Sequence, residues 1–177
     1  MKYSSFQFTI FSLIIALCLN FSCEKQTEKG DVEKMAQEDL QLDQIPQVVM
    51  DALKAKFPDA EIHKWDREKE GDIVVYDFEF KQVGQNFEAD IQENGMIHNW
   101  EKAIEVTDLP EAVRATIDEM YPGATLKEIM EITEVKGTDE KLEGYEVVVE
   151  IPDKGETEIT IAPDGTILED SGEENPE

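Results

Sequence analysis

The feature that most constrains this 177-residue chain is a segment that occurs twice. Residues 45–60 read IPQVVMDALKAKFPDA and residues 109–124 read LPEAVRATIDEMYPGA, so each match is displaced by 64 positions. In both copies the apolar residues recur three or four positions apart, which is the spacing of one buried helical face. The repeat therefore predicts two equivalent short helices and, with them, two similar modules.

A proline closes each copy of the repeat. Pro58 and Pro122 end the predicted helices, because the residue before a proline is pushed away from helical backbone angles. Helices of this length are marginal in water, so each one needs an apolar surface to lie on. We expect Leu53 and Ile117, which occupy equivalent positions in the two copies, to be core residues facing the strands that follow.

Each predicted helix is followed by four segments with the pattern of β-strands. Their apolar and charged residues alternate, which is typical of strands with one buried face. The predicted strands are residues 61–69, 73–81, 87–92 and 96–104 in the first module, and 125–135, 145–151, 157–161 and 166–168 in the second, where residues 136–144 form a polar loop. Asn94–Gly95 and Asp164–Gly165 predict tight hairpin turns, since these residue types tolerate positive φ.

One such module is too small to be stable on its own, since a chain of ~64 residues buries only ~60% of its unfolded surface. We therefore predict an α+β fold in which two tandem modules form one folded unit. Each module is a helix followed by a four-stranded antiparallel meander. We expect the helices to lie on one face of the sheet.

The N-terminal residues predict export. Lys2 precedes an apolar run that ends at Ser22–Cys23 and is short for a transmembrane helix. This arrangement resembles a bacterial lipoprotein signal, cut before Cys23 with the lipid attached to that cysteine. An ordinary cleaved signal peptide and an uncleaved anchor are the alternatives. Cys18 would be removed with the signal, so the mature chain would have no free thiol for a disulfide or for thiol catalysis.

These features divide the chain into five parts. We predict a signal peptide at 1–22, an acidic tether at 23–44, modules at 45–106 and 107–169, and a disordered acidic tail at 170–177. The tether and the tail are polar and lack a convincing apolar stripe, so neither is expected to pack. The predicted location is the cell envelope, on the periplasmic or surface side of a membrane.

The repeated pattern resembles a known family. The second copy reads LP-x-x-V-x-x-x-I-x-x-x-YPG, and the first is followed by FPDAEIHKW, in which Phe57, Pro58, Ala60 and Trp65 match the family's FPNA-x-x-V-x-W stretch. Together with the meander and the hairpin turns, residues 45–169 resemble the PepSY-like lipoproteins of Bacteroidetes-type bacteria. The resemblance implies a fold similar to that of β-lactamase-inhibitory protein. It implies no catalytic residue, because the family has none established.

The charge of the chain restricts its partners. With 16 basic and 42 acidic residues, the formal net charge is −26. A nucleic-acid partner is excluded, because phosphate binding needs the opposite charge. Adsorption of the folded part to anionic lipid is disfavoured for the same reason, so the predicted contact with a membrane is through the lipid anchor alone.

Part of this acidic charge has a predicted position. The strand alternation directs seven carboxylates away from the helix-covered face, and no comparable number of lysines or arginines accompanies them. These candidate binding residues are Asp77, Glu79, Glu88, Asp90, Glu146, Glu150 and Glu158. They form either an interaction face for a basic protein or for cations, or a solvated face that keeps the chain soluble and prevents aggregation.

No motif in the sequence predicts a metal site, a cofactor or catalysis. There is no D-x-[DN]-x-[DN]-G calcium loop, although weak divalent cation binding is compatible with the acidity. His63 and His98 without cysteine make a poor metal site, and Trp65 and Trp100 nearby are expected to pack in the core. No nucleophile elbow or glycine-rich phosphate loop occurs.

We therefore predict a non-enzymatic envelope lipoprotein that binds a basic-surfaced protein or peptide through the open acidic sheet face. The role of inhibitor or modulator of a secreted or envelope enzyme rests on fold analogy. The alternative is a module that binds or sequesters calcium-type cations.

Overall fold

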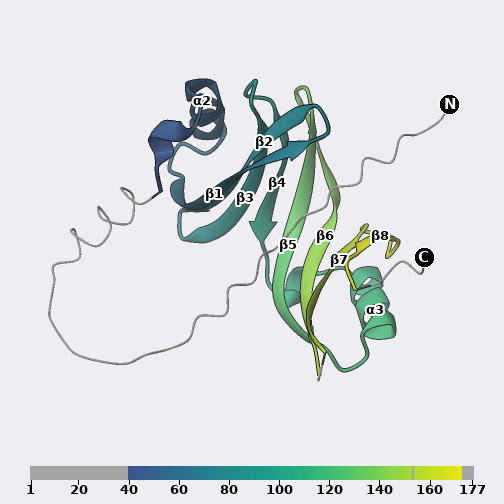
Figure 1. The fold of residues 1–177 in the computed structure, drawn as a ribbon. Helices are drawn as coiled ribbons and strands as arrows, with labels where there is room; N and C mark the ends of the chain where they lie inside the picture. Colours follow the sequence, from purple (N-terminus) through teal and green to yellow (C-terminus); the bar gives the residue numbers. More distant parts are fainter. Residues whose placement is uncertain (1–39, 153, 173–177) are drawn as a thin grey trace, which may run out of the picture.

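The computed structural model describes residues 40–152 and 154–172 (Figure 1). The predicted signal peptide, Cys23 and most of the predicted tether lie outside these residues, as does the end of the tail. Within the described ranges, no helix combines the length and the apolar character needed to cross a membrane.

The described chain contains helices and strands in the predicted order. The helical segments are the 3-10 turns η1 (Leu42–Gln44) and η2 (Val106–Asp108) and the α-helices α2 (Gln47–Lys56) and α3 (Glu111–Met120). The first four strands are β1 (Glu61–Glu70), β2 (Ile73–Gln82), β3 (Gln85–Gln92) and β4 (Ile97–Ala103). The last four are β5 (Thr125–Lys136), β6 (Asp139–Ile151), β7 (Gly155–Ile161) and β8 (Ile167–Asp170).

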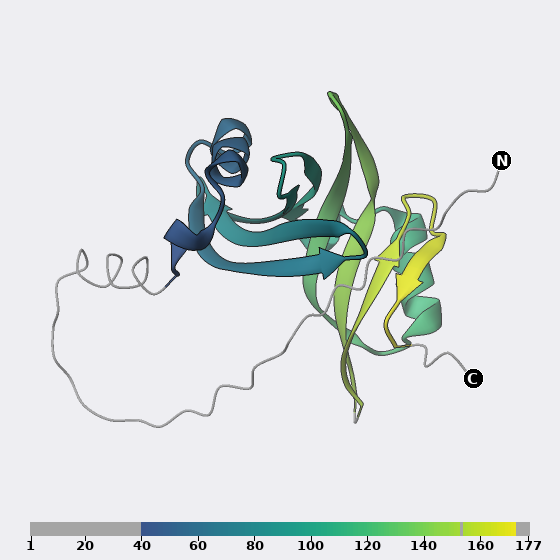
Figure 2. The ribbon, with the colours of Figure 1, turned by 45° about the horizontal axis from the view of Figure 1, so that its top comes forward.

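The strands form one sheet. Its eight described strands lie in the order β1-β2-β3-β4-β5-β6-β7-β8, and each neighbouring pair is antiparallel. The two halves join where β4 pairs with β5, over five residue pairs from Asn99–Glu134 to Ala103–Met130. Figures 1 and 2 show α2 and α3 at opposite ends of this strongly twisted sheet. The predicted α+β architecture of two helices with antiparallel strands is confirmed, and the structure adds that the two modules share one sheet.

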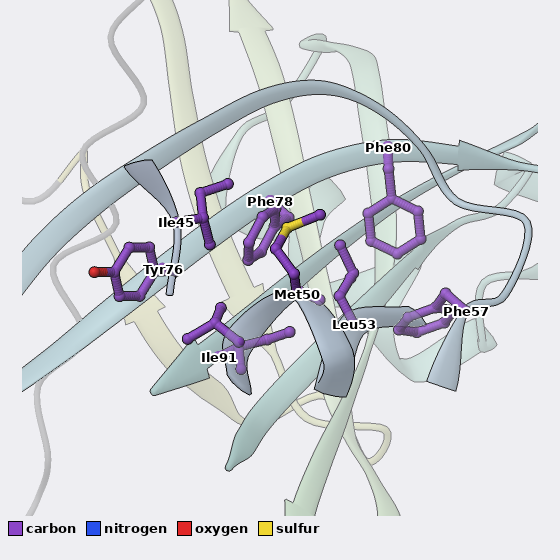
Figure 3. Close-up of a cluster of buried hydrophobic side chains, with 10 residues drawn as sticks. Ile45, Met50, Leu53, Phe57, Tyr76, Phe78, Phe80 and Ile91 are labelled. Carbon is purple, nitrogen blue, oxygen red and sulfur yellow. The ribbon is translucent and has the colours of Figure 1, made fainter. Parts of the chain in front are cut away.

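Each helix covers a separate apolar cluster. In the first half, Leu53 of α2 is fully buried in one cluster with Phe78 and Phe80 of β2 (Figure 3). Val49 of α2 is fully buried in the same cluster. Phe57, at the end of α2, contacts the Phe80 ring with 4.8 Å between the ring centroids. Ring pairs of this kind stabilise a core beyond their buried area.

The second cluster repeats this arrangement with aliphatic residues. Val113 and Ile117 of α3 pack in one buried cluster with Val147 of β6 and Ile159 of β7. Ile117 is 3% exposed and Leu53 is 0% exposed, so the two equivalent positions of the repeat are both core positions, as predicted.

The predicted hairpin glycines allow each helix to lie close to its own half of the sheet. Gly95 has a φ of 84°, and a Cβ added to it would lie 3.0 Å from the carbonyl oxygen of Val48 on α2. Gly165 has a φ of 90°, and its Cβ would lie 3.1 Å from the carbonyl oxygen of Ala112 on α3. Val48 and Ala112 are themselves equivalent in the repeat, so glycine is required by both the turn and the contact.

Three boundaries differ from the prediction. The polar loop expected at 136–144 is wrong, because β6 begins at Asp139 and pairs with β5 out to Lys136. Cross-strand pairing of polar residues, including Glu134 opposite Lys141, extends this hairpin without any buried face.

In the predicted tether, the Leu40 carbonyl accepts a hydrogen bond from the Trp65 indole. In the predicted tail, β8 reaches Asp170 and the next residue also hydrogen-bonds to β7.

Candidate functional site

The first four predicted acidic residues lie side by side on β2 and β3. On β2, Phe78 is buried under α2, so its neighbours Asp77 and Glu79 point to the other side of the sheet. The register pairs Asp77 with Asp90 and Glu79 with Glu88. Like charges directly opposite each other on neighbouring strands are destabilising when ionised.

The register carries the same side of the sheet into the second half. Glu88 lies opposite Glu101 on β4, Glu101 lies opposite Ile132 on β5, and Met130 lies opposite Glu146 on β6. Glu150 and Glu158 occupy positions on this same side. We call this surface the acidic face, and its residues are Asp77, Glu79, Glu88, Asp90, Glu101, Glu146, Glu150 and Glu158.

Glu101 is a member that sequence analysis missed. It is only 5% exposed, and Glu146 is only 8% exposed, although both side chains are on the side away from the helix-covered clusters. The alternation of β4 could have predicted the position of Glu101. Trp100 points toward the aromatic cluster, so its neighbour Glu101 points to the other side of the sheet. The sequence did not predict that the Glu101 and Glu146 side chains are buried, since their burial depends on residues of neighbouring strands.

The two ends of the acidic face carry ion pairs. Lys64 on β1 lies 2.5 Å from a carboxylate oxygen of Glu79, and Lys127 on β5 lies 3.1 Å from Glu150. Lys64 therefore has its pKa raised, first by its hydrogen bond with Glu79. Among the predicted carboxylates, Glu79 and Glu150 are therefore each accompanied by a lysine. Exposed pairs of this kind contribute little stability.

Carboxyl groups at and beside the centre of the acidic face have raised pKa values. Burial is the main cause that raises the pKa of Asp77 to about 6 and of Glu88 to about 8, with nearby carboxylates adding to it. Burial also raises the pKa of Glu146 to about 11, followed by the charges of Glu101 and Glu158. The pKa of Glu101 lies well above its usual value for the same reasons. Ionised carboxylates this close to one another repel, which favours the protonated form of some of them.

Two oxygens at this centre lack partners. The Oε2 atoms of Glu101 and Glu146 are buried and take part in no hydrogen bond within the described residues. Met130 and Ile132 lie between the two side chains on β5 and are 2% and 6% exposed. A buried polar atom without a partner is rare in native proteins and calls for an explanation.

The two tryptophans pack against the first core. Trp65 stacks on Tyr76 with ring centroids 6.2 Å apart, and Trp100 meets Phe57 edge-on at 6.0 Å. The ammonium group of Lys56 lies 5.0 Å from the Trp100 ring centroid. The predicted core role of the two tryptophans is confirmed. Across the described ranges, no three histidine, cysteine or acidic side chains form a group that could hold a metal ion.

A hollow of about 480 Å³ lies beside the β2–β3 turn, away from the centre of the acidic face. Lys81, Lys102, Glu105 and Asp108 are among its lining residues, which include no histidine, cysteine or hydroxyl side chain. The ammonium group of Lys102 lies 3.5 Å from Glu131.

Solved structures share this fold. A DUF2874 family protein from Bacteroides uniformis is similar, with 17% identity over 71% of this chain and 87% of that chain and a TM-score of 0.53. A Bacteroides eggerthii structure described as "putative periplasmic proteins" has 16% identity over 71% and 86%, with a TM-score of 0.54. A BLIP-like protein from Bacteroides fragilis has 20% identity over 75% and 92%, with a TM-score of 0.48.

A comparison with curated proteins finds no match. The model of the family described as "Putative beta-lactamase-inhibitor-like, PepSY-like" matches the chain twice, over residues 27–99 and 95–169. The predicted resemblance to the PepSY-like family is therefore confirmed. The two matches correspond to the two tandem modules. Since these matches together span most of the chain, the protein belongs to this PepSY-like family.

Proposed function

We propose that this protein is a non-enzymatic envelope lipoprotein that binds a basic-surfaced protein through the acidic face. The observation that carries the proposal is the concentration of eight carboxylates on one side of one sheet, among which Glu79 and Glu150 at the two ends pair with lysines. A basic partner would relieve the repulsion among them and would be steered toward them over long distances.

The register supports an open face. Core residues under α2, such as Ala89, and under α3, such as Val147, occupy the same alternate positions across the sheet. We propose on this basis that both helices lie on the side opposite the acidic face, which leaves the acidic face free for a partner.

The relatives support the class of function. The family description includes the words "beta-lactamase-inhibitor-like", and one relative is described as BLIP-like. These words favour binding to a protein, as an inhibitor or modulator of a secreted or envelope enzyme, over catalysis. Lipidation of Cys23 would hold the module at the membrane, and the sequence pattern around that cysteine supports it.

The alternative is binding or sequestration of calcium-type cations. It has weaker support, because the described residues hold no group of three side chains arranged for a metal ion. Calorimetric titration with calcium chloride separates the two functions. Saturable, stoichiometric binding that also stabilises the fold would favour the cation module.

The proposed function is tested by capture of partners from the native envelope, with cross-linking to the full-length protein. Asp77→Asn combined with Glu150→Gln removes charge from both halves of the acidic face and should reduce capture. Asp118→Asn combined with Glu119→Gln removes the same charge from the exposed surface of α3 and should not. Equal capture by the two double variants at low salt would refute a role for the acidic face.

A further inference from the structure

Four carboxyl groups lie at the centre of the acidic face, and we call them the central quartet. They are Glu88 on β3, Glu101 on β4, Glu146 on β6 and Glu158 on β7. Glu88 and Glu101 are direct cross-strand partners, so their Cβ atoms are about 5 Å apart. Glu158 lies opposite Val148, next to Glu146, and its carboxyl group hydrogen-bonds to that of Glu146.

The central quartet differs from the ends of the face in its lack of cations. The ion pairs on this side involve Lys64 and Lys127, whose partners are Glu79 and Glu150. No ion pair to a member of the central quartet occurs within the described residues. Yet Glu101 and Glu146 are more than nine-tenths buried, each with one unpartnered oxygen.

The groups that face the central quartet from the surrounding strands are also acidic. Asp77 and Glu79 on β2, Asp90 on β3 and Glu128 on β5 act on Glu88. Glu128 and Glu169, the latter on β8, act on Glu158. Every strand from β2 to β8 thus contributes a carboxyl group to this region, and the quartet has acceptor oxygens without a matching donor.

We propose that the central quartet is the receptor for one cationic side chain, a guanidinium or ammonium group, that projects from the partner and pairs with the unpartnered oxygens of Glu101 and Glu146. This inference rests on the proposed function and names the chemistry of its contact. A guanidinium group carries five N–H donors in a planar fork and pairs well with two carboxylates. A metal ion is disfavoured, because the described side chains do not converge as a set of three ligands.

Binding of such a cation has a proton balance. Each neutral carboxyl group that pairs with the cation loses its proton to the solvent and becomes a carboxylate, while the cation keeps its charge. Binding therefore releases protons, and by linkage the affinity falls as the pH is lowered. Burial and neighbouring carboxylates raise the pKa of Glu146 to about 11, so this group still carries a proton that binding can release across the neutral range.

The probe for the test is the blocked peptide acetyl-Gly-Arg-Gly-amide, which carries a single positive charge. Its control is the same peptide with citrulline, which has nearly the same shape but no charge. The ¹³C resonances of glutamate carboxyl groups in the full-length protein report binding. The arginine peptide should shift the Glu101 and Glu146 resonances and bind at least tenfold more tightly at pH 8 than at pH 5.

Variants locate the binding. Glu101→Gln and Glu146→Gln should each weaken the arginine peptide at least tenfold at pH 8, whereas Glu119→Gln on α3 should not change its affinity. Glutamine resembles a protonated glutamate in shape, and an unchanged amide spectrum confirms that each variant is folded. Equal binding of the citrulline peptide, or binding that survives both substitutions, would overturn the proposal.

Two further results distinguish this inference from the proposed function. If calcium chloride saturates the Glu101 and Glu146 resonances and the arginine peptide leaves them unmoved, the quartet is a cation site and the proposal is wrong. If the arginine peptide does not bind but partner capture still depends on Asp77 and Glu150, the central quartet is not the receptor for a cationic side chain. The acidic face then remains the proposed binding surface.

Discussion

Replacing Glu146 by glutamine should stabilise the protein at neutral pH. The folded state raises the pKa of Glu146 from 4.5 to about 11, so the folded chain keeps a proton that the unfolded chain loses above pH 4.5. Unfolding therefore releases a proton, and the contribution of Glu146 to stability is full below pH 4.5 and declines as the pH rises toward 11.

The magnitude follows from the interval between pH 4.5 and pH 7. At about 1.4 kcal/mol for each pH unit, Glu146 lowers the free energy of unfolding by about 3 kcal/mol at pH 7. This value is an upper limit, since Glu101 and Glu158 interact with Glu146 and share the effect. Glu146→Gln removes the titration and can still donate a hydrogen bond to Glu158.

The assay is urea denaturation of the wild type and the variant between pH 5 and pH 8. The variant should be more stable by up to about 3 kcal/mol at pH 7 and by less than about 1 kcal/mol at pH 5. Glu119→Gln, on the exposed surface of α3, is the control for loss of charge alone. A variant that is less stable than the wild type, or a difference that does not change with pH, would refute the reasoning.

Three further predictions concern the core, a turn and the anchor. Leu53→Ala and Ile117→Ala should each lower the free energy of unfolding by about 2–5 kcal/mol in denaturant melts, as truncations at buried positions do, and a neutral result at either site would contradict the packing. Gly95→Ala should cost about 2–3 kcal/mol, and Gly84→Ala, which has a similar φ but open space around it, about 1 kcal/mol. Equal losses of unfolding free energy for the two glycine variants, measured in denaturant melts, would show that the close contact between Gly95 and Val48 does not add to the cost. Cys23→Ser should release the protein from the membrane fraction, whereas an N-terminus beyond Cys23 in wild-type protein, found by mass spectrometry, would rule out lipidation.

The sequence predicted the elements well because their signals are local. Apolar residues at Val49 and Leu53 have helical spacing, those of β2 alternate, and Gly95 follows asparagine at a turn. The resemblance to the family rests on these same positions, which specify the core and the turns.

The acidic face was only partly predictable, since its properties depend on register. Alternation predicted the side of its own strand on which Glu88 and Glu146 each lie, but it did not indicate that Glu101 faces Glu88 or that both Glu101 and Glu146 are buried. Likewise, the extension of β6 to Asp139 depends on pairing with β5, because its polar residues carry no periodic apolar signal.

The order of the strands in the sheet has a consequence for how the chain folds. Every strand pairs with the strand next to it in sequence, so each pairing closes only the short segment between two consecutive strands. The longest of these connections runs from Ala103 to Thr125 and carries α3. Local pairings of this kind carry small loop-closure penalties and are associated with rapid folding. The strand order therefore allows the sheet to be extended one strand at a time from β1 to β8, in the order in which the strands are synthesised.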